Sequence, residues 1–302
     1  MEKVIIIGAG PAGISAALYA VRGNLDPLVI NNGIGALEKA EKIENYYGLE
    51  HPLSGQELYD TGIAQAKALG VRILDAQVLG VGGFDTFVVK TTKGEFETQS
   101  LILATGSRRA APKIPGVKEF EGKGVSYCAI CDAFFYRGKN VAVLGNGDFA
   151  MHEAKELSNT ASTVTIYTNG EEPEFTPEGN ISVNTMKIQS VEGDDLVSGI
   201  RLAPDIQAQE MNADAGQQAN DFCPAAGVFI AMGTAGSTEI ARQMGADLTE
   251  KGNIKVDENM ETTIPGLYAA GDCTGGLLQV AKAVYEGAQA GINAGKYVRS
   301  LK

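Results

Sequence analysis

The chain contains few of the residues that build metal centres or disulfide frameworks, with four cysteines and two histidines among 302 residues. The cysteines are Cys128, Cys131, Cys223 and Cys273. One close pair and two isolated cysteines do not make the framework of a small secreted protein. A structural zinc site usually needs a second pair of Cys or His ligands, and neither His51 nor His152 lies in such a pair. We therefore expect no metal.

Positive charge and long apolar runs are also scarce. The 25 Lys and Arg residues are outnumbered by 37 Asp and Glu residues, for a formal net charge of -12, which argues against nucleic acid or an anionic membrane surface as the partner. The apolar run at residues 4–21 is interrupted by Gly8, Gly10 and Gly13, so a buried strand and its helix explain it better than a membrane span. We expect a cytoplasmic protein with no membrane segment, and the length favours two domains.

Two glycine loops of the dinucleotide-binding type are the main positive signal. The first, GAGPAG at residues 8–13, lies between strand-like residues 3–7 and helix-like residues 14–22. In this context the three glycines permit, in order, a tight turn, close approach of a pyrophosphate, and close packing of helix on strand. The acidic residue that usually binds ribose after the second strand is absent. Asn31 and Asn32 stand there, and their amides can also bond ribose hydroxyls.

The second loop, GNGDFA at residues 145–150, follows an apolar strand-like run at 141–144 and precedes a helix-like segment. Between the two loops lies YCAICD at residues 127–132. Two cysteines separated by two residues can close into a small, reversible disulfide, and the adjacent carboxyl group can move protons. Two dinucleotide-type units with a redox CxxC between them indicate a flavin enzyme that passes electrons to a protein disulfide.

Together these features resemble the low-molecular-weight thioredoxin reductase family over essentially the whole chain. The motifs that carry the resemblance are GAGPAG at 8–13, ENYYG at 44–48, ATGS at 104–107, CAICDAFFYRGK at 128–139, GNGDFA at 145–150 and AAGDC at 269–273. The resemblance implies an α/β fold of two Rossmann-like (three-layer ββα) dinucleotide-binding-type domains, the second inserted into the first. The FAD-binding domain would comprise residues 1–113 and 233–302, and the inserted NAD(P)-binding-like domain, carrying the CxxC, residues 114–232. A homodimer is also expected.

The same resemblance implies FAD as the cofactor and assigns residues from both ends of the chain to it. The residues expected to line the pyrophosphate are Gly8, Gly10, Pro11, Ala12 and Gly13. The residues expected near the flavin or along the cofactor are Asn45, Thr105, Gly106, Gly271, Asp272, Gln279 and Val280. Of these, Asp272 should accept a hydrogen bond from a ribityl hydroxyl, whereas Gln279 and Val280 should present backbone N–H groups to the flavin ring.

The resemblance also assigns the catalytic residues. Cys131 would take electrons from the flavin, Cys128 would attack the disulfide of thioredoxin, and Cys131 would then resolve the mixed disulfide. Asp132 would be the acid that supplies the proton, although a carboxylate also suits the first turn of a helix. Cys223 and Cys273 are interpreted as ordinary small residues.

The expected binding site for NADPH is missing. NADPH-dependent relatives carry an HRRxxxR run after the strand that ends here at Tyr167, but residues 168–174 read TNGEEPE, and no Lys or Arg occurs between Lys155 and Lys187. A charge-assisted hydrogen bond contributes about 1.5–3 kcal/mol, so losing two costs about 3–6 kcal/mol. That is roughly a hundredfold to ten-thousandfold in affinity. NADH, which lacks the 2′-phosphate, is excluded less strongly, but the sequence offers no acid to hold its ribose.

The pattern is similar to the ferredoxin-dependent flavin thioredoxin reductases, which lack the nicotinamide clamp, so ferredoxin is the expected electron donor. Residues 107–139 are locally basic and could steer an acidic ferredoxin. Their cations are Arg108, Arg109, Lys113, Lys118, Lys123, Arg137 and Lys139, against the anions Glu119, Glu121 and Asp132.

Other interpretations remain open at this point. The chain could be an NAD(P)H-dependent thioredoxin reductase with an unusual clamp, or a flavin-dependent dithiol oxidase that passes electrons to oxygen. It could also hold a second flavin in the inserted domain, or act without turnover as a redox-sensing binding module.

Overall fold

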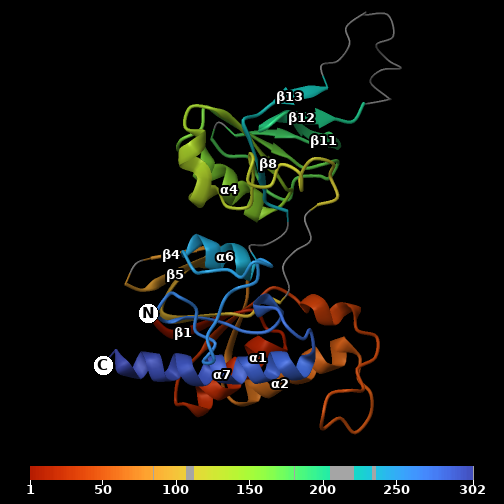
Figure 1. Cartoon of the computed structure of the whole chain (residues 1–302). Coiled ribbons are helices and arrows are strands. Elements are labelled where there is room, and N and C mark those ends of the chain that lie inside the picture. Colours follow the sequence, from red (N-terminus) through yellow and green to blue (C-terminus); the bar gives the residue numbers. More distant parts are fainter. Residues whose placement is uncertain (84, 107–111, 180, 205–220, 233–235, 302) are drawn as a thin grey trace, which may run out of the picture. The chain divides into compact units, whose positions relative to one another are not determined.

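The structure is a computed structural model of the chain and describes all residues except 84, 107–111, 180, 205–220, 233–235 and 302 (Figure 1). The side chains of Ile130 and Cys131 also lie outside this description. The chain divides into two compact units. Unit 1 comprises Met1–Arg109 and Ala235–Lys302, and unit 2 comprises Ala110–Thr234.

Unit 1 is built on a seven-stranded sheet in the order β3-β2-β1-β6-β5-β4, with β15 paired to β6. Its strands are β1 (Glu2–Ile7), β2 (Leu28–Asn31), β3 (Arg72–Asp75), β4 (Val78–Gly82), β5 (Phe87–Thr91), β6 (Gly94–Leu103) and β15 (Leu267–Ala269). The pairs β1–β2, β2–β3, β1–β6 and β6–β15 are parallel, whereas β4, β5 and β6 run antiparallel. The apolar run of β1 is buried because a central parallel strand is covered on both faces.

The helices of unit 1 bring the two ends of the chain together. They are α1 (Pro11–Arg22), η1 (Gly35–Lys39), α2 (Gly55–Ala68), α6 (Ser237–Gln243), η3 (Asp272–Thr274) and α7 (Val280–Ser300), and α1, α2 and α7 gather on one side of the sheet (Figure 1). Helices α1 and α7 approach closely at two glycines of α7. A Cβ on Gly287 would lie 2.1 Å from the Ala12 carbonyl oxygen, and a Cβ on Gly291 would lie 2.3 Å from the Ala16 carbonyl oxygen. Only glycine allows this contact.

Unit 2 contains a parallel sheet in the order β10-β9-β8-β14-β7 and a smaller antiparallel sheet of β11, β12 and β13. The strands are β7 (Val125–Ser126), β8 (Asn140–Leu144), β9 (Thr163–Tyr167), β10 (Ile181–Asn184), β11 (Ile188–Gly193), β12 (Val197–Leu202), β13 (Phe222–Pro224) and β14 (Gly227–Ile230). The helical segments are α3 (Ala129–Asp132), η2 (Ala133–Tyr136) and α4 (Asp148–Ser158). The predicted α/β fold with two Rossmann-like units is confirmed. Within the described part of the chain, no helix combines the length and hydrophobicity that a membrane crossing requires.

Candidate functional site

The first glycine loop connects β1 to α1 in a geometry that depends on glycine. Gly8 has a φ of +109°, and its Cβ would lie 2.3 Å from the Ala104 carbonyl oxygen, while a Cβ on Gly13 would lie 1.8 Å from the carbonyl oxygen of Gly8. The Gly8 N–H donates to the carbonyl of Ile30 at 2.9 Å, which ties the loop to the next strand. The predicted roles of these glycines in the turn and in helix packing therefore match their surroundings.

The helix start that follows the loop has an open side. Gly10 is the N-cap of α1 without a side-chain cap, Pro11 begins the helix, and a Cβ built on Gly10 meets nothing within 4 Å. Uncapped N–H groups at a helix N-terminus favour an anionic group. The open side of this loop leaves room for an anionic group at this end of α1, and the binding of a pyrophosphate by residues 8–13 stays a prediction.

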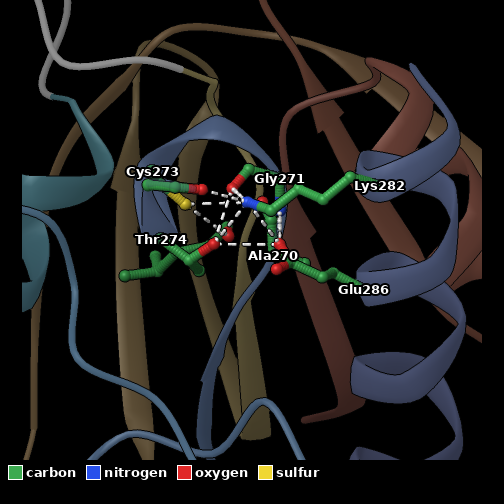
Figure 2. A network of polar contacts seen from close by, with 8 residues as sticks. Ala270, Gly271, Cys273, Thr274, Lys282 and Glu286 are labelled. Atoms are coloured by element: carbon green, nitrogen blue, oxygen red, sulfur yellow. Dashed lines mark hydrogen bonds and ion pairs between the residues drawn. The ribbon is translucent and has the colours of Figure 1, made fainter. Parts of the chain in front are cut away.

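The turn from Gly271 to Gly275 lies against the same helix. Gly271 and Gly275 have φ values of +88° and +80°, and a Cβ on Gly271 would lie 3.0 Å from the Cβ of Ala12. Figure 2 shows that Lys282, in the first turn of α7, points into this turn, where its Nζ donates to the Gly271 carbonyl at 2.7 Å and to Thr274 Oγ1 at 2.8 Å.

Glu286 completes this network from the next turn of α7. Its Oε2 accepts from the Gly271 N–H at 2.8 Å and from Thr274 Oγ1 at 2.9 Å, and it pairs with Lys282 Nζ at 2.9 Å (Figure 2). Sequence reasoning missed Lys282 and Glu286. The available signal was an oppositely charged pair, four residues apart, at the start of a helix rich in small residues.

Asp272 lies in the turn that this network fixes, and it is half-buried. Burial raises the pKa of its carboxyl group, the positive charge of Lys282 opposes that increase, and Glu286 adds to it. A half-buried carboxylate beside an open helix terminus can accept a hydrogen bond from a ligand hydroxyl.

Two predicted site residues that are far apart in sequence meet in unit 1. Asn45 Nδ2 donates to Gln279 Oε1 at 2.9 Å across 234 positions. Gln279 is the N-cap of α7 without a side-chain cap, and Val280 is the first residue of that helix. Because α7 packs against α1 at Gly287 and Ala12, the N-terminal ends of the two helices lie close together.

Thr105 and Gly106 follow β6, and Thr105 contacts a residue that the sequence did not indicate. The Thr105 and Ser237 hydroxyl oxygens lie 2.7 Å apart, and the Ser237 N–H donates to Thr105 Oγ1 at 2.9 Å. Ser237 is buried at the start of α6. The amide of Asn31, considered a ribose ligand, is bonded to the carboxylate of Asp75 at 2.7 Å and to the Tyr59 hydroxyl at 2.9 Å.

Three groups of predicted cofactor residues in unit 1 carry features that suit a dinucleotide. The glycine loop offers uncapped N–H groups, the Gly271 turn packs on Ala12, and the uncapped α7 start joins Asn45. An elongated ligand with a pyrophosphate and a polyhydroxylated chain matches this order of groups.

The predicted redox segment, residues 127–132, lies in unit 2, where β7 leads into α3. Cys128 is buried and disulfide-bonded. Its N–H donates to Ser126 Oγ at 3.1 Å, and that hydroxyl donates to Asp132 Oδ2 at 2.6 Å. The backbone of Cys131 belongs to α3, but its side chain lies outside the described part of the structure. Ser126, which sequence reasoning missed, joins Asp132 to the segment.

A second carboxyl group reaches the redox segment from α4. Glu153 is 3% exposed, and its Oε2 accepts from the Ala129 N–H at 2.7 Å. Burial raises the pKa of this carboxyl to about 7, against the lowering effect of the Ala129 N–H. Sequence reasoning missed Glu153, because nothing in the sequence distinguishes it from neighbouring helix glutamates.

The surroundings of the redox segment include two exposed aromatic side chains. Phe134 and Phe135 in η2 are 72% and 68% exposed, and the Arg137 guanidinium lies 5.8 Å from the centre of the Phe134 ring. The other two cysteines, Cys223 and Cys273, are free thiols. Burial raises the pKa of Cys273 to about 12, so it is unreactive near neutral pH.

The second glycine loop is in contact with a later part of the chain. We call residues 168–178 the acidic segment. The Glu174 N–H donates to the Asn146 carbonyl at 2.7 Å, and its carboxylate oxygen lies 3.9 Å from the position of a Cβ on Gly147, the N-cap of α4. Glu178 is paired with Lys155 on the same helix at 2.8 Å. The acidic segment therefore places a carboxylate at the helix start where a nucleotide phosphate would bind.

Comparisons with known proteins agree over nearly the whole chain. The family described as pyridine nucleotide-disulphide oxidoreductase matches residues 2–287. The thioredoxin reductase of Treponema pallidum is 36% identical over 313 aligned positions, covering 99% of this chain and 98% of that protein. The structure of the atypical thioredoxin reductase TRi from Desulfovibrio vulgaris Hildenborough is 38% identical, with a TM-score of 0.87 and 99% of both chains covered.

A ferredoxin-flavin thioredoxin reductase from Clostridium acetobutylicum is 29% identical, with a TM-score of 0.68, covering 99% of this chain and 98% of that one. The predicted FAD cofactor and the predicted family are both confirmed. The chain therefore belongs to the pyridine nucleotide-disulphide oxidoreductase family and, within it, to the FAD-containing thioredoxin reductases.

Proposed function

We propose that this protein reduces thioredoxin through FAD and a Cys128–Cys131 dithiol, and that its electron donor is a ferredoxin rather than NADPH. When bound, FAD supplies the chemistry that converts delivered electrons into a pair for the disulfide. The observation that carries the donor assignment is the position of Glu174 on the second glycine loop. The same loop holds the pyrophosphate of NADPH in the reductases that use it.

The acidic segment opposes a nicotinamide nucleotide in charge as well as in position. Its glutamates are Glu171, Glu172, Glu174 and Glu178. Of the nearby cations, Lys155 is paired with Glu178, and Lys187 has its Cβ 3.8 Å from the position of a Cβ on Gly170. A single lysine does not reproduce the bidentate guanidinium contacts that hold a 2′-phosphate.

Two further observations support a ferredoxin as the donor. One solved structure that matches this chain over 98% of its own length is described as a ferredoxin-flavin thioredoxin reductase. The direction of transfer is also favourable: a plant-type ferredoxin at about -400 mV and thioredoxin at about -270 mV differ by about 130 mV. For two electrons this corresponds to about 6 kcal/mol.

We call residues 107–139 the basic segment, and its described part supports steering of an acidic donor. Its cations are Lys113, Lys118, Lys123, Arg137 and Lys139, and all of these residues are exposed. Arg108 and Arg109 lie outside the described residues. Opposite charges on two partners accelerate their encounter, even where they add little to affinity.

In the proposed exchange, Cys128 attacks the disulfide of thioredoxin and Cys131 then resolves the mixed disulfide. Asp132 is the proposed proton donor to the departing thiolate, and its bond to Ser126 Oγ keeps it beside the redox segment. The exposed Phe134 and Phe135 offer an apolar surface next to Cys128 for the protein substrate. The enzyme is also proposed to work as a homodimer, which sedimentation of the holoenzyme would test.

The deciding experiment follows the flavin absorbance of the anaerobic holoenzyme during successive additions of NADPH, NADH and reduced ferredoxin, with oxidised thioredoxin as acceptor. We expect only ferredoxin to bleach the oxidised flavin band and thioredoxin to restore it. Bleaching by NADPH at a catalytic rate would show a conventional reductase. Flavin reduction by small dithiols followed by reoxidation with oxygen alone would instead indicate a dithiol oxidase.

A further inference from the structure

We propose that Glu153 is a positioning residue for the redox segment and that its carboxylate takes up a proton when the Cys128 disulfide is reduced. The inference rests on the proposed function in one respect only, namely that Cys128 and Cys131 form the redox pair. It does not depend on which donor supplies the electrons.

The position of Glu153 is fixed by two packed helices. It projects from α4 and accepts a hydrogen bond at 2.7 Å from the N–H of Ala129, the residue directly after Cys128. Its side chain is almost fully removed from water, with 3% of the residue exposed. A buried carboxylate bonded to this N–H fixes the backbone between Cys128 and α3. A change of charge at the cysteine therefore alters the electrostatic field at Glu153 and the protonation of its carboxyl group.

None of the ion pairs in the described part of the structure joins Glu153 to a cation. On its own helix, Glu156 adds repulsion, Lys155 is paired with Glu178, and the titratable His152 directly precedes Glu153. Of the elements packed against α4, α3 carries Cys131 and Asp132 in its sequence and β9 carries Tyr167, whereas β8 and β10 carry no titratable side chain. Burial and Glu156 together bring the pKa of Glu153 to about 7.

The proposed step balances as follows. A dithiol reductant loses two electrons and two protons as its own disulfide forms, and the Cys128–Cys131 S–S bond breaks. If both sulfurs become thiols, both protons are consumed there. If one sulfur remains a thiolate, one proton is left over, and the Glu153 carboxylate binds it and becomes a neutral carboxylic acid.

The physical reason is repulsion between two buried anions. A thiolate next to Ala129 and an ionised Glu153 would share one low-dielectric region, which disfavours the charged form of both groups. Protonation of Glu153 allows the thiolate, which is the nucleophile toward thioredoxin, to persist. Because the carboxyl is already near its midpoint at pH 7 in the oxidised protein, a small change in the field is enough to shift its protonation.

The test is the pH dependence of the reduction equilibrium of the enzyme disulfide in the holoenzyme. Wild type, Glu153→Gln and the matched control Glu156→Gln are equilibrated with dithiothreitol redox buffers from below to above pH 7, and free thiols are counted by alkylation and mass spectrometry. We expect the wild type to show a bend in the pH profile near 7. E156Q should keep the bend at a lower pH, because the repulsion between Glu156 and Glu153 is removed, and E153Q should lose it. A merely structural role would shift the whole profile without removing the bend.

Several outcomes contradict the proposal. An E153Q profile that superimposes on the wild type overturns the role of Glu153, while the redox pair itself stands. A Cys128 disulfide that no dithiol buffer reduces defeats the proposed function and, with it, this inference. Should E153Q fail to fold, difference infrared spectra of the wild type decide: a protonated carboxyl band must grow on reduction at pH 7 and above, and its absence overturns the proposal.

Discussion

Lys282 and Glu286 form an ion pair of 2.9 Å across one turn of α7, and both side chains bond to the same short turn at Gly271. The pair therefore acts as a brace between the N-terminal end of α7 and the residue preceding Asp272. The brace is well shielded, with side chains only 16% and 12% exposed. Truncating one partner leaves the other charge buried without compensation, which costs more than the pair itself contributes.

We predict that Lys282→Met weakens retention of FAD. Loss of a charge-assisted hydrogen bond to the Gly271 turn costs about 1.5–3 kcal/mol, or at least roughly tenfold in the dissociation constant of FAD. The measurement is flavin released on ultrafiltration of the diluted holoenzyme. Lys255→Met, at an exposed lysine whose nearest carboxylate is 3.9 Å away, is the control. Equal retention by both variants would show that the brace does not support the cofactor site.

The sequence was sufficient to predict the parts of the site that depend on local backbone geometry. The glycines at positions 8, 10 and 13 could be recognised because their spacing between a strand and a helix is typical of a dinucleotide-binding loop. The Asn45–Gln279 contact could be anticipated only through the family resemblance, since 234 positions separate the two residues. Ser126, Glu153 and Lys282 were not predicted, because their importance comes from burial and from partners supplied by the tertiary fold.

Two alanine substitutions in the first glycine loop should separate folding from cofactor binding. Gly13→Ala places a methyl group 1.8 Å from the Gly8 carbonyl oxygen, so it should destabilise unit 1 by about 1–3 kcal/mol. Gly10→Ala meets no protein atom within 4 Å, so it should destabilise the apoprotein less than Gly13→Ala, by no more than the N-cap preference for Gly over Ala, and it should weaken FAD binding. Denaturant unfolding of the apoproteins, together with FAD titration, measures both effects. Similar stability losses in both variants would contradict the assignment of the open side of Gly10 to the cofactor.

The buried carboxyl of Glu153 should make folding stability depend on pH. Its pKa is about 7 in the folded protein and 4.5 in the reference state, so the folded state binds more protons between these two values. The contribution of Glu153 to the free energy of unfolding is therefore most favourable below about pH 4.5, and it is lost as the pH rises through about 7. The shift corresponds to about 3 kcal/mol.

Urea unfolding at several pH values, comparing wild type with Glu153→Gln, isolates this contribution. The difference in unfolding free energy between the two proteins should change in favour of the variant as pH rises toward 7. A difference that stays constant with pH would mean that Glu153 does not change its protonation in this range. Glu156→Gln, on the same helix, makes the same change in charge but keeps the Glu153 carboxyl, so it should retain the dependence on pH, shifted to lower pH because Glu156 no longer repels Glu153.

Charge reversal in the basic segment should slow electron delivery from ferredoxin without harming the redox segment. The exposed lysines Lys113 and Lys118 lie in unit 2 and outside the FAD-site residues. Electrostatic steering changes association rates by about 10- to 1000-fold, so Lys113→Glu with Lys118→Glu should reduce the rate of flavin reduction at low ionic strength at least tenfold. The difference from wild type should shrink as salt is added, because screening shortens the range of the interaction.

The matched control is Lys251→Glu with Lys255→Glu, which makes the same change in net charge at exposed lysines of unit 1. If both double variants slow reduction equally, net charge alone explains the effect and the basic segment is not the docking surface. If neither slows it, an acidic donor does not approach through electrostatic steering at this segment. Thiol exchange with a small disulfide should be the same in the wild type and both double variants. The hydrogen bonds that position the redox segment involve none of the four substituted lysines.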